Sequence, residues 1–422
     1  MTQYTKTLAP NYHWNFFAFL TDYVCFSVAF SFISVSSVLP ALVGQLSDSA
    51  PVIGLVNTVY IGGWLLPQLA VARLINDKPR KRPYMLVGLS CRVLFWVIAL
   101  GLWAGLASYP TAMLILFFTC LGLFAIFDGF TSVSWFDILA RAIPLQQRGR
   151  LSGIAQFISG LIGVGVGGLV SVILGRYTFP NNYALLLTLA GIALIPSTIA
   201  LILIREPPPK TDRDAPDSMT RDKWCQILAN PHFCRLIGSR LLIGSMGLAT
   251  SFYVLHAERV LRLPPQVIGQ FVSAETLARI VGSLILGLVG ERWGPRYVAR
   301  IGSAVAALGP LFALIVHLTQ AEWLIPAYPL VYVALGIINS TWMMGFTNYM
   351  LEIAPEHMRS AYVGLGNTIL GALTLMPMIG GWLLEATSYT TLFGLSATVI
   401  TLGFLLTLGL KPAQEVVQQS NA

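Results

Sequence analysis

Six charged side chains interrupt long apolar stretches of this sequence, and each is suited to hold a proton or a charged group. Three are carboxylates and three are guanidinium groups: Asp22, Asp128, Glu275, Arg92, Arg240 and Arg279. A carboxylate in apolar surroundings can take up and release a proton. A guanidinium group in such surroundings can hold a carboxylate or a phosphate. These residue types therefore indicate proton exchange and anion binding.

The remaining sequence contains no catalytic constellation. There is no nucleophile–base pair and no Walker sequence, and the five histidines do not show the spacing of metal ligands. Glycines crowd residues 160–168, but no strand precedes them, so they do not form a dinucleotide fingerprint. We therefore expect no enzyme activity, no cofactor and no metal.

Composition places the chain in a lipid bilayer. Of the 422 residues 55% are hydrophobic and only 10% are charged, whereas a soluble protein carries about a quarter charged residues. A soluble core cannot account for this apolar excess, but lipid-facing side chains can. In a membrane protein the net charge of +8 indicates basic cytoplasmic loops that face anionic lipid.

Twelve apolar runs are long enough to span a bilayer, since a helix needs roughly twenty residues to do so. We place them at 16–40, 52–74, 84–106, 111–139, 151–174, 183–204, 233–256, 267–290, 297–318, 327–353, 362–384 and 391–410. A charged, proline-rich linker separates the sixth from the seventh. The sequence predicts an all-α membrane protein with two six-helix bundles, 1–205 and 231–422, joined by a cytoplasmic linker at 206–230.

Basic residues set the expected orientation. With twelve spans both termini lie on one side, and of the 26 Lys and Arg residues only Arg176, Arg259 and Arg262 fall in loops on the other side. By the positive-inside rule the termini are cytoplasmic. The basic stretch "RLINDKPRKRP" (Arg73–Pro83) is then a cytoplasmic loop and not a nucleic-acid patch.

The two halves repeat each other in parallel orientation. "PLQQRGRLSG" (Pro144–Gly153) and "PEHMRSAYVG" (Pro355–Gly364) both follow the fourth helix of a half, and they lie 211 positions apart. "ARLINDKPRK" (Ala72–Lys81) and "GLVGERWGPR" (Gly287–Arg296) both follow the second helix, 215 positions apart. Matches in the same order at nearly one offset indicate two copies of one six-helix unit.

On these motifs the sequence resembles the major facilitator superfamily, because "GLVGERWGPR" is similar to the signature loop of that family. The resemblance implies two bundles around a central cavity lined by the first and fourth helices of each half, with alternating access. It also implies that the acidic residue of this loop helps to latch the cytoplasmic side. The subfamily stays unassigned, since the signatures of drug–proton antiporters, sugar porters and peptide carriers are missing.

The first-half loop departs from the family pattern. Asn76 stands at the acidic position and Pro79 at a glycine position, with Asp77 adjacent. The second copy keeps Glu291 and Gly294, so we expect it to be the stronger latch. The expected cytoplasmic gate comprises Asn76, Asp77, Arg80, Lys81, Glu291, Arg292, Gly294, Arg296, Arg148 and Arg359.

Two roles remain open for most of the charges within the spans. Asp128 lies about 16 Å from the cytoplasmic end of its helix, so it is either a protonatable cavity group or the partner of Arg92. Asp22 has the same two roles open. Arg240 has no acidic residue on its own helix and is the best candidate to bind an anionic substrate group.

The remaining candidates lie in the eighth and tenth helices. Glu275 and Arg279 are four residues apart, which predicts an ion pair within the helix. Asn339, Trp342 and Asn348 could contact a substrate or serve internal packing.

We therefore expect a monomeric secondary transporter of a small solute in a bacterial cytoplasmic membrane. Coupling to protons would run through Asp128 or Asp22. One alternative is an uncoupled facilitator of the same fold, in which both aspartates are structural. Another is a membrane receptor or sensor that transports nothing.

Overall fold

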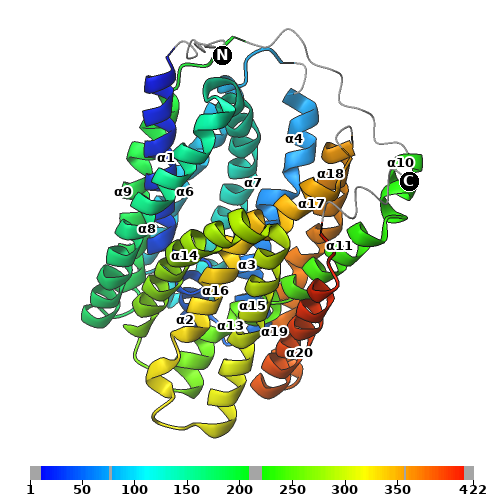
Figure 1. The fold of residues 1–422 in the computed structure, drawn as a ribbon. Coiled ribbons are helices and arrows are strands. Elements are labelled where there is room, and N and C mark those ends of the chain that lie inside the picture. Colours follow the sequence, from blue (N-terminus) through cyan, green and yellow to red (C-terminus); the bar gives the residue numbers. More distant parts are fainter. Residues whose placement is uncertain (1–10, 76–77, 209–220, 356–357, 413–422) are drawn as a thin grey trace, which may run out of the picture. The chain divides into compact units, whose positions relative to one another are not determined.

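The computed structural model describes residues 11–75, 78–208, 221–355 and 358–412, and these residues form helices and no β-strand (Figure 1). The helices gather into two compact units. Unit 1 comprises 1–34, 59–166 and 176–213, and unit 2 comprises 35–58, 167–175 and 214–422. The predicted all-helical fold is confirmed.

Among the described residues, ten helical segments are long and apolar enough to cross a membrane. They are Tyr12–Phe32, Arg82–Trp103, Pro110–Ala142, Gln147–Arg176, Asn181–Ile202, Val267–Trp293, Pro295–Thr319, Ile325–Ile353, Ala361–Ala386 and Tyr389–Leu408. Each overlaps one of the spans predicted from sequence. In a bilayer a helix is favoured because it satisfies every backbone hydrogen bond within its own segment.

The second and seventh predicted spans are helical but interrupted. The second consists of α3 (Ala50–Leu65) and α4 (Pro67–Ile75), and Pro67 explains the break because it has no amide hydrogen to donate. The seventh consists of α11 (Pro231–Gly244), α12 (Gly247–Thr250), α13 (Phe252–Leu255) and a π-helix, η3 (His256–Val260). With these two, the helical segments agree with the twelve-helix architecture.

In unit 1 the helices pack around buried aromatic rings. The elements are α1 (Tyr12–Phe32), α4, α5 (Arg82–Leu89), η1 (Ser90–Val93), α6 (Leu94–Trp103), η2 (Leu106–Ser108), α7 (Pro110–Ala142) and α9 (Asn181–Ile202). Helix α9 packs against α1 and α6, and α7 packs against α4, α5 and α6 (Figure 1). Phe95 lies 4.6 Å from Phe124 between ring centroids, and Phe30 contacts both. This packing joins α1, α6 and α7, and Asp22 and Asp128 lie on α1 and α7.

Unit 2 contains the remaining elements. Besides the interrupted seventh span they are α2 (Val38–Leu46), α10 (Arg221–Leu228), α14 (Val267–Trp293), α15 (Pro295–Thr319), η4 (Ile325–Ala327), α16 (Leu330–Thr341), η5 (Trp342–Thr347), α17 (Asn348–Ile353), α18 (Arg359–Leu370), η7 (Gly371–Leu375), α19 (Met376–Ala386) and α20 (Tyr389–Leu408). Helix α14 packs along α16, and α15 lies between α16 and α20 (Figure 1). Phe271 and Tyr332 stack with ring centroids 4.3 Å apart, which joins α14 to α16.

Two helices belong partly to each unit. Helix α3 passes from unit 2 into unit 1 after residue 58, and α8 (Leu145–Arg176) passes into unit 2 after residue 166. Within unit 2, Gly381 approaches the backbone of Ala50 and Pro51 so closely that a Cβ atom would lie 2.6 Å from it. The bundle boundaries at 205 and 231 were drawn from the order of the helices, and they stay a prediction.

Large apolar side chains cover the outer faces of the helices. On α14, Leu284, Ile285 and Leu288 are all more than half exposed. Exposed apolar stripes of this length are unfavourable in water and favourable against lipid chains. This distribution agrees with an integral membrane protein.

Candidate functional site

The first candidate group is a buried ion pair in unit 1. Arg92 of η1 and Asp22 of α1 lie 3.2 Å apart between Nη2 and Oδ1, and both side chains are less than a tenth exposed. Arg92 also donates to the hydroxyls of Ser197 (2.6 Å) and Thr198 (3.2 Å) of α9. The guanidinium group is thereby neutralised and hydrogen-bonded where water cannot reach it, which a buried charge requires.

The second oxygen of Asp22 is also occupied. Trp135 of α7 donates from its indole Nε1 to Oδ2 at 2.8 Å, and Ser197 donates to Oδ1 at 2.5 Å. Asp22 therefore ties α1 to η1, α7 and α9. Asp22 is therefore the ion-pair partner of Arg92 in the structure, and no ion pair joins Arg92 to Asp128. The role of Asp128 stays a prediction.

Asp128 stands apart from that network. It lies in the middle of α7 and is partly exposed. Within the described residues its carboxylate makes no hydrogen bond and no ion pair, in contrast to the fully occupied carboxylate of Asp22. A carboxylate in the middle of a spanning helix that has no partner among the described residues is a group that can exchange a proton.

Arg240 of α11 is the second charge without a partner. Its Nε and Nη1 atoms are buried and donate to no hydrogen-bond acceptor in the described part of the chain. The guanidinium carbon lies 5.7 Å from the ring centroid of Trp342 and 6.0 Å from that of Phe346. Aromatic rings therefore supply the nearest electrostatic stabilisation of this cation.

A π-helix places the two rings. The segment η5 interrupts the tenth span, and the Thr347 hydroxyl donates to the Trp342 carbonyl, five residues earlier, at 3.1 Å. The wider turn brings Trp342 and Phe346 together with ring centroids 5.3 Å apart. Short π-helical turns inside α-helices are frequent at functional sites.

Glu275 of α14 does not form the predicted pair with Arg279. Its Oε2 accepts a hydrogen bond from Ser36 at 2.6 Å, and its Oε1 accepts one from Asn339 at 3.2 Å. Arg279 is exposed and forms no ion pair with a described residue. The spacing of four residues allowed the pair, but the two neutral donors satisfy the carboxylate from neighbouring segments.

Further contacts in unit 2 tie residues 35–58 to the seventh span. Asn57 donates to Ser251 at 2.8 Å and to the carbonyl of Val35 at 2.9 Å. Arg259 donates to the carbonyl of Gly44 at 2.8 Å and lies 3.2 Å from the carboxylate of Asp48. Together with the bond from Ser36 to Glu275, these contacts form one polar seam, which we call the 35–58 seam.

The first-half gate loop is anchored by a residue outside it. Glu206 accepts backbone N–H bonds from Lys81 (2.7 Å) and Arg82 (3.1 Å), and it forms a 2.6 Å ion pair with Arg141 of α7. Lys81 is buried and donates to the carbonyl of Ile75, whereas Arg80 is exposed. The predicted gate residues 76 and 77 lie outside the described residues.

The second-half gate loop has a different environment. Gly294 has φ +90°, a conformation that only glycine adopts readily, so the signature glycine ends α14 and starts α15. Arg292 and Arg296 lie over the rings of Trp293 and Tyr297. These arginines make local contacts rather than contacts across the bundle.

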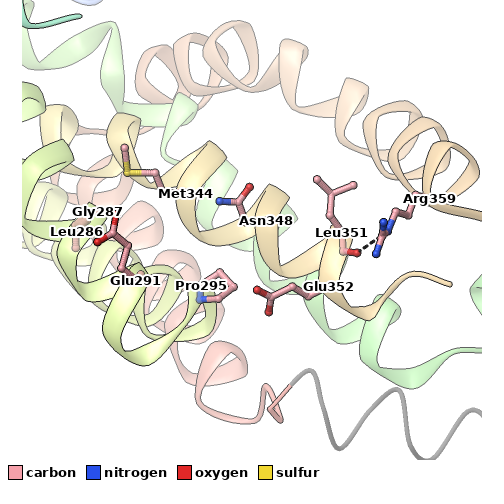
Figure 2. A pocket seen from close by; sticks show the side chains of 10 residues that line it. Leu286, Gly287, Glu291, Pro295, Met344, Asn348, Leu351, Glu352 and Arg359 are labelled. Atoms are coloured by element: carbon pink, nitrogen blue, oxygen red, sulfur yellow. Dashed lines mark hydrogen bonds between the residues drawn. The ribbon is translucent and has the colours of Figure 1, made fainter. Parts of the chain in front are cut away.

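Glu291 lines a pocket of about 550 Å³ in unit 2 (Figure 2). The other lining residues are Leu286, Gly287, Gly290, Pro295, Met344, Asn348, Leu351, Glu352 and Arg359. In the described part of the chain, the carboxylate of Glu291 makes neither a hydrogen bond nor an ion pair. The structure thus assigns Asn348 to the gate end of this half and Trp342 to the environment of Arg240.

The two repeat arginines make the same contact in each half. Arg148 donates to the carbonyl of Ala140 at 2.7 Å, and Arg359 donates to the carbonyl of Leu351 at 3.2 Å (Figure 2). Both acceptors lie eight residues before the arginine, where the preceding helix ends. A cation there satisfies unpaired carbonyl groups and complements the helix dipole.

Several residues of these groups were missed from the sequence. Trp135, Ser197 and Phe346 belong to spans in which aromatic and hydroxyl residues are common, and Glu206 falls at the start of the predicted linker. The position of Glu206, next to Arg205 at the end of a span, was the only signal. In the described residues no cluster of three or more His, Cys, Asp or Glu side chains could hold a metal.

The comparisons with known proteins identify the family. The family model of the Major Facilitator Superfamily matches residues 23–374 and 263–421, and the chain therefore belongs to this superfamily of membrane transporters. The subfamily is not assigned. The chain also matches an uncharacterized MFS-type transporter of Mycobacterium tuberculosis, with 28% identity over 142 residues. That match spans 33% of this chain and 24% of the relative.

Solved structures share the fold. A bacterial homologue of the iron transporter ferroportin, in an inward-facing state, has a TM-score of 0.69 and 14% identity, over 93% of this chain and 98% of that one. A D-xylose–proton symporter has a TM-score of 0.65 and 16% identity, over 96% of this chain and 97% of that one. The protein is therefore an integral membrane protein with the transporter fold of the superfamily.

Proposed function

We propose that the protein is a secondary active transporter that moves a small solute by alternating access and exchanges protons at Asp128. The observation that supports this assignment is the contrast between Asp22 and Asp128, two aspartates in spanning segments of unit 1. Asp22 is bound by Arg92, Trp135 and Ser197, whereas Asp128 has no partner among the described residues and is partly exposed. Only Asp128 can change its protonation without breaking an ion pair.

The proposed setting is a bacterial cytoplasmic membrane, with both termini in the cytoplasm and the chain acting as a monomer. The distribution of lysine and arginine over the predicted loops supports this orientation. The D-xylose–proton symporter of the same fold shows that this architecture is compatible with proton coupling.

The test has two stages. A thermal-unfolding screen of small solutes first finds compounds that stabilise the purified protein, since a ligand of the folded state raises the midpoint. These solutes are then added to proteoliposomes that contain a pH-sensitive dye, and the solute-dependent proton flux is recorded. We expect the Asp128→Asn variant to lose the proton flux while it keeps its thermal midpoint and its solute binding.

The matched control is Glu322→Gln, which removes one carboxylate from an exposed loop position. This variant should retain the flux of the unmodified protein. A full solute-dependent proton flux in Asp128→Asn would remove Asp128 from the mechanism.

The experiment also separates the alternatives. Solute flux without any proton flux in the unmodified protein would identify an uncoupled facilitator. Solute binding without flux of either kind would identify a receptor or sensor. No contact in the structure favours either of these over coupled transport.

A further inference from the structure

Arg240 is a cation enclosed among apolar groups without an anion. Its neighbours on α11 include Phe233, Ile237 and Ile243, all buried in the same core cluster as Phe346. No acidic side chain of the described chain forms an ion pair with it. A charge in such surroundings costs several kcal/mol of free energy unless it is paired or has a function.

The aromatic rings offset only part of that cost. Trp342 and Phe346 present their faces to the guanidinium group, and such cation–π contacts stabilise a desolvated cation. The rings leave the N–H groups unsatisfied, because Nε and Nη1 are enclosed without acceptors. The remaining terminal nitrogen, Nη2, is not among the enclosed atoms and also makes no hydrogen bond to a described residue.

We propose that Arg240, held between Trp342 and Phe346, binds the carboxylate of a small organic anion that is the transported solute. A planar guanidinium group offers paired N–H donors that match the two oxygens of a carboxylate. Such a ligand neutralises the charge and satisfies the donors at the same time. The substrate thus supplies the anion that the described residues do not provide.

The site favours a ligand with a single negative charge. It contains one cation, and the faces of the two rings carry negative electrostatic potential, which disfavours excess anionic charge. A monocarboxylate with an apolar body is therefore preferred over a dianionic phosphate ester.

The proposed transport function enters this inference at one point, the statement that the bound anion is the transported solute. The binding itself is measured without transport. The probes are three monocarboxylates and their neutral amides: benzoate, phenylacetate and hexanoate, with benzamide, phenylacetamide and hexanamide. Phenyl phosphate serves as the dianionic probe of similar shape. The full chain is purified in detergent, and its thermal midpoint is measured against the concentration of each probe.

We expect at least one carboxylate to raise the midpoint in a saturable manner while its amide does not. The Arg240→Gln variant should weaken the apparent affinity about tenfold or more, because a charged hydrogen-bonded pair is lost. Arg240→Lys should retain part of the affinity, since it keeps the charge but not the fork. Arg176→Gln, at an exposed position at the end of α8, is the matched control and should bind as the unmodified protein does.

Three outcomes would overturn the proposal. One is that no carboxylate shifts the midpoint of the unmodified protein more than its amide. Another is that the shift persists undiminished in both Arg240 variants. The third is that phenyl phosphate binds more tightly than every carboxylate. The same titration on Asp128→Asn keeps this inference distinct from proton coupling, because carboxylate binding there should remain even if coupling is lost.

Discussion

Two arginines in spanning segments, Arg92 in the first half and Arg240 in the second, have opposite environments. Arg92 contacts an aspartate and two hydroxyl groups, and its guanidinium group is fully accounted for. Arg240 contacts the faces of Trp342 and Phe346, and two of its nitrogens have no acceptor.

The difference separates structural charges from charges available for function. A paired cation holds helices together, and the chain cannot lose either partner without leaving the other exposed to a low dielectric. An unpaired cation contributes nothing to stability and is retained for another reason. The same distinction applies to Asp22 and Asp128, so partner count is more informative than depth in the membrane.

The largest expected effect comes from replacing each arginine by methionine. Arg92→Met should lower the free energy of unfolding by about 3–5 kcal/mol, because it leaves Asp22 buried without its partner. Arg240→Met should leave stability unchanged or raise it, because it removes an uncompensated cation. Thermal midpoints of the two variants in detergent measure the difference, and equal destabilisation would show that Arg240 is structural as well.

Replacing Asp22 should lower the stability of the protein more than replacing Asp128, as for the two arginines. Asp22→Asn should cost about 1.5–3 kcal/mol, since it weakens the charged hydrogen bonds to Arg92 and Trp135. Asp128→Asn should not lower the midpoint, because its carboxylate has no partner among the described residues. A drop in the midpoint of Asp128→Asn as large as that of Asp22→Asn would contradict the comparison.

The loops predicted to form the gate extend the comparison to the end of the second helix of each half. Glu206→Gln should cost about 1–2 kcal/mol of stability, because it removes the charge that pairs with Arg141 and binds the loop backbone. Glu291→Gln should change stability by less than about 0.5 kcal/mol, as is usual for an exposed side chain. Urea or thermal unfolding of both variants measures these changes in stability. A larger loss of stability in Glu291→Gln than in Glu206→Gln would show that the second-half loop is anchored more firmly.

The smallest effect is expected in the 35–58 seam. Ser36→Ala removes one of the two donors to Glu275 and should lower the free energy of unfolding by about 1 kcal/mol. Ser283→Ala on the same helix, which loses only a bond to the backbone of Arg279, is the control. If both variants unfold at the same midpoint, the bond from Ser36 contributes nothing beyond a local one.

The fold was largely predictable because hydrophobic length and charge bias are local properties of a sequence. The apolar runs, the repeat motifs and the glycine at 294 all indicated the architecture that the structure has. Individual partners were less predictable. Asp22, Asp128 and Arg92 were all identified as intramembrane charges, but the pairing required knowing which faces of α1, α7 and η1 meet.

Glu275 and Arg279 illustrate why sequence spacing alone does not predict an ion pair. A separation of four residues puts Glu275 and Arg279 on one face of the helix. In the structure, however, the carboxylate of Glu275 accepts its hydrogen bonds from Ser36 and Asn339. These donors are 239 and 64 residues away in sequence. No local pattern records such distances.

By itself the sequence determined that this chain spans a membrane, that its halves repeat and that charged side chains, among them Asp128 and Arg240, lie within the spans. Those properties follow from the cost of placing polar groups in lipid, which each segment meets on its own. Only the tertiary structure decided which charges are neutralised and which stay open, because neutralisation depends on side chains that other helices bring within 3 Å or so. Asp128 and Arg240 are the charges in spanning segments that we propose for function, because neither has an ion-pair partner among the described residues.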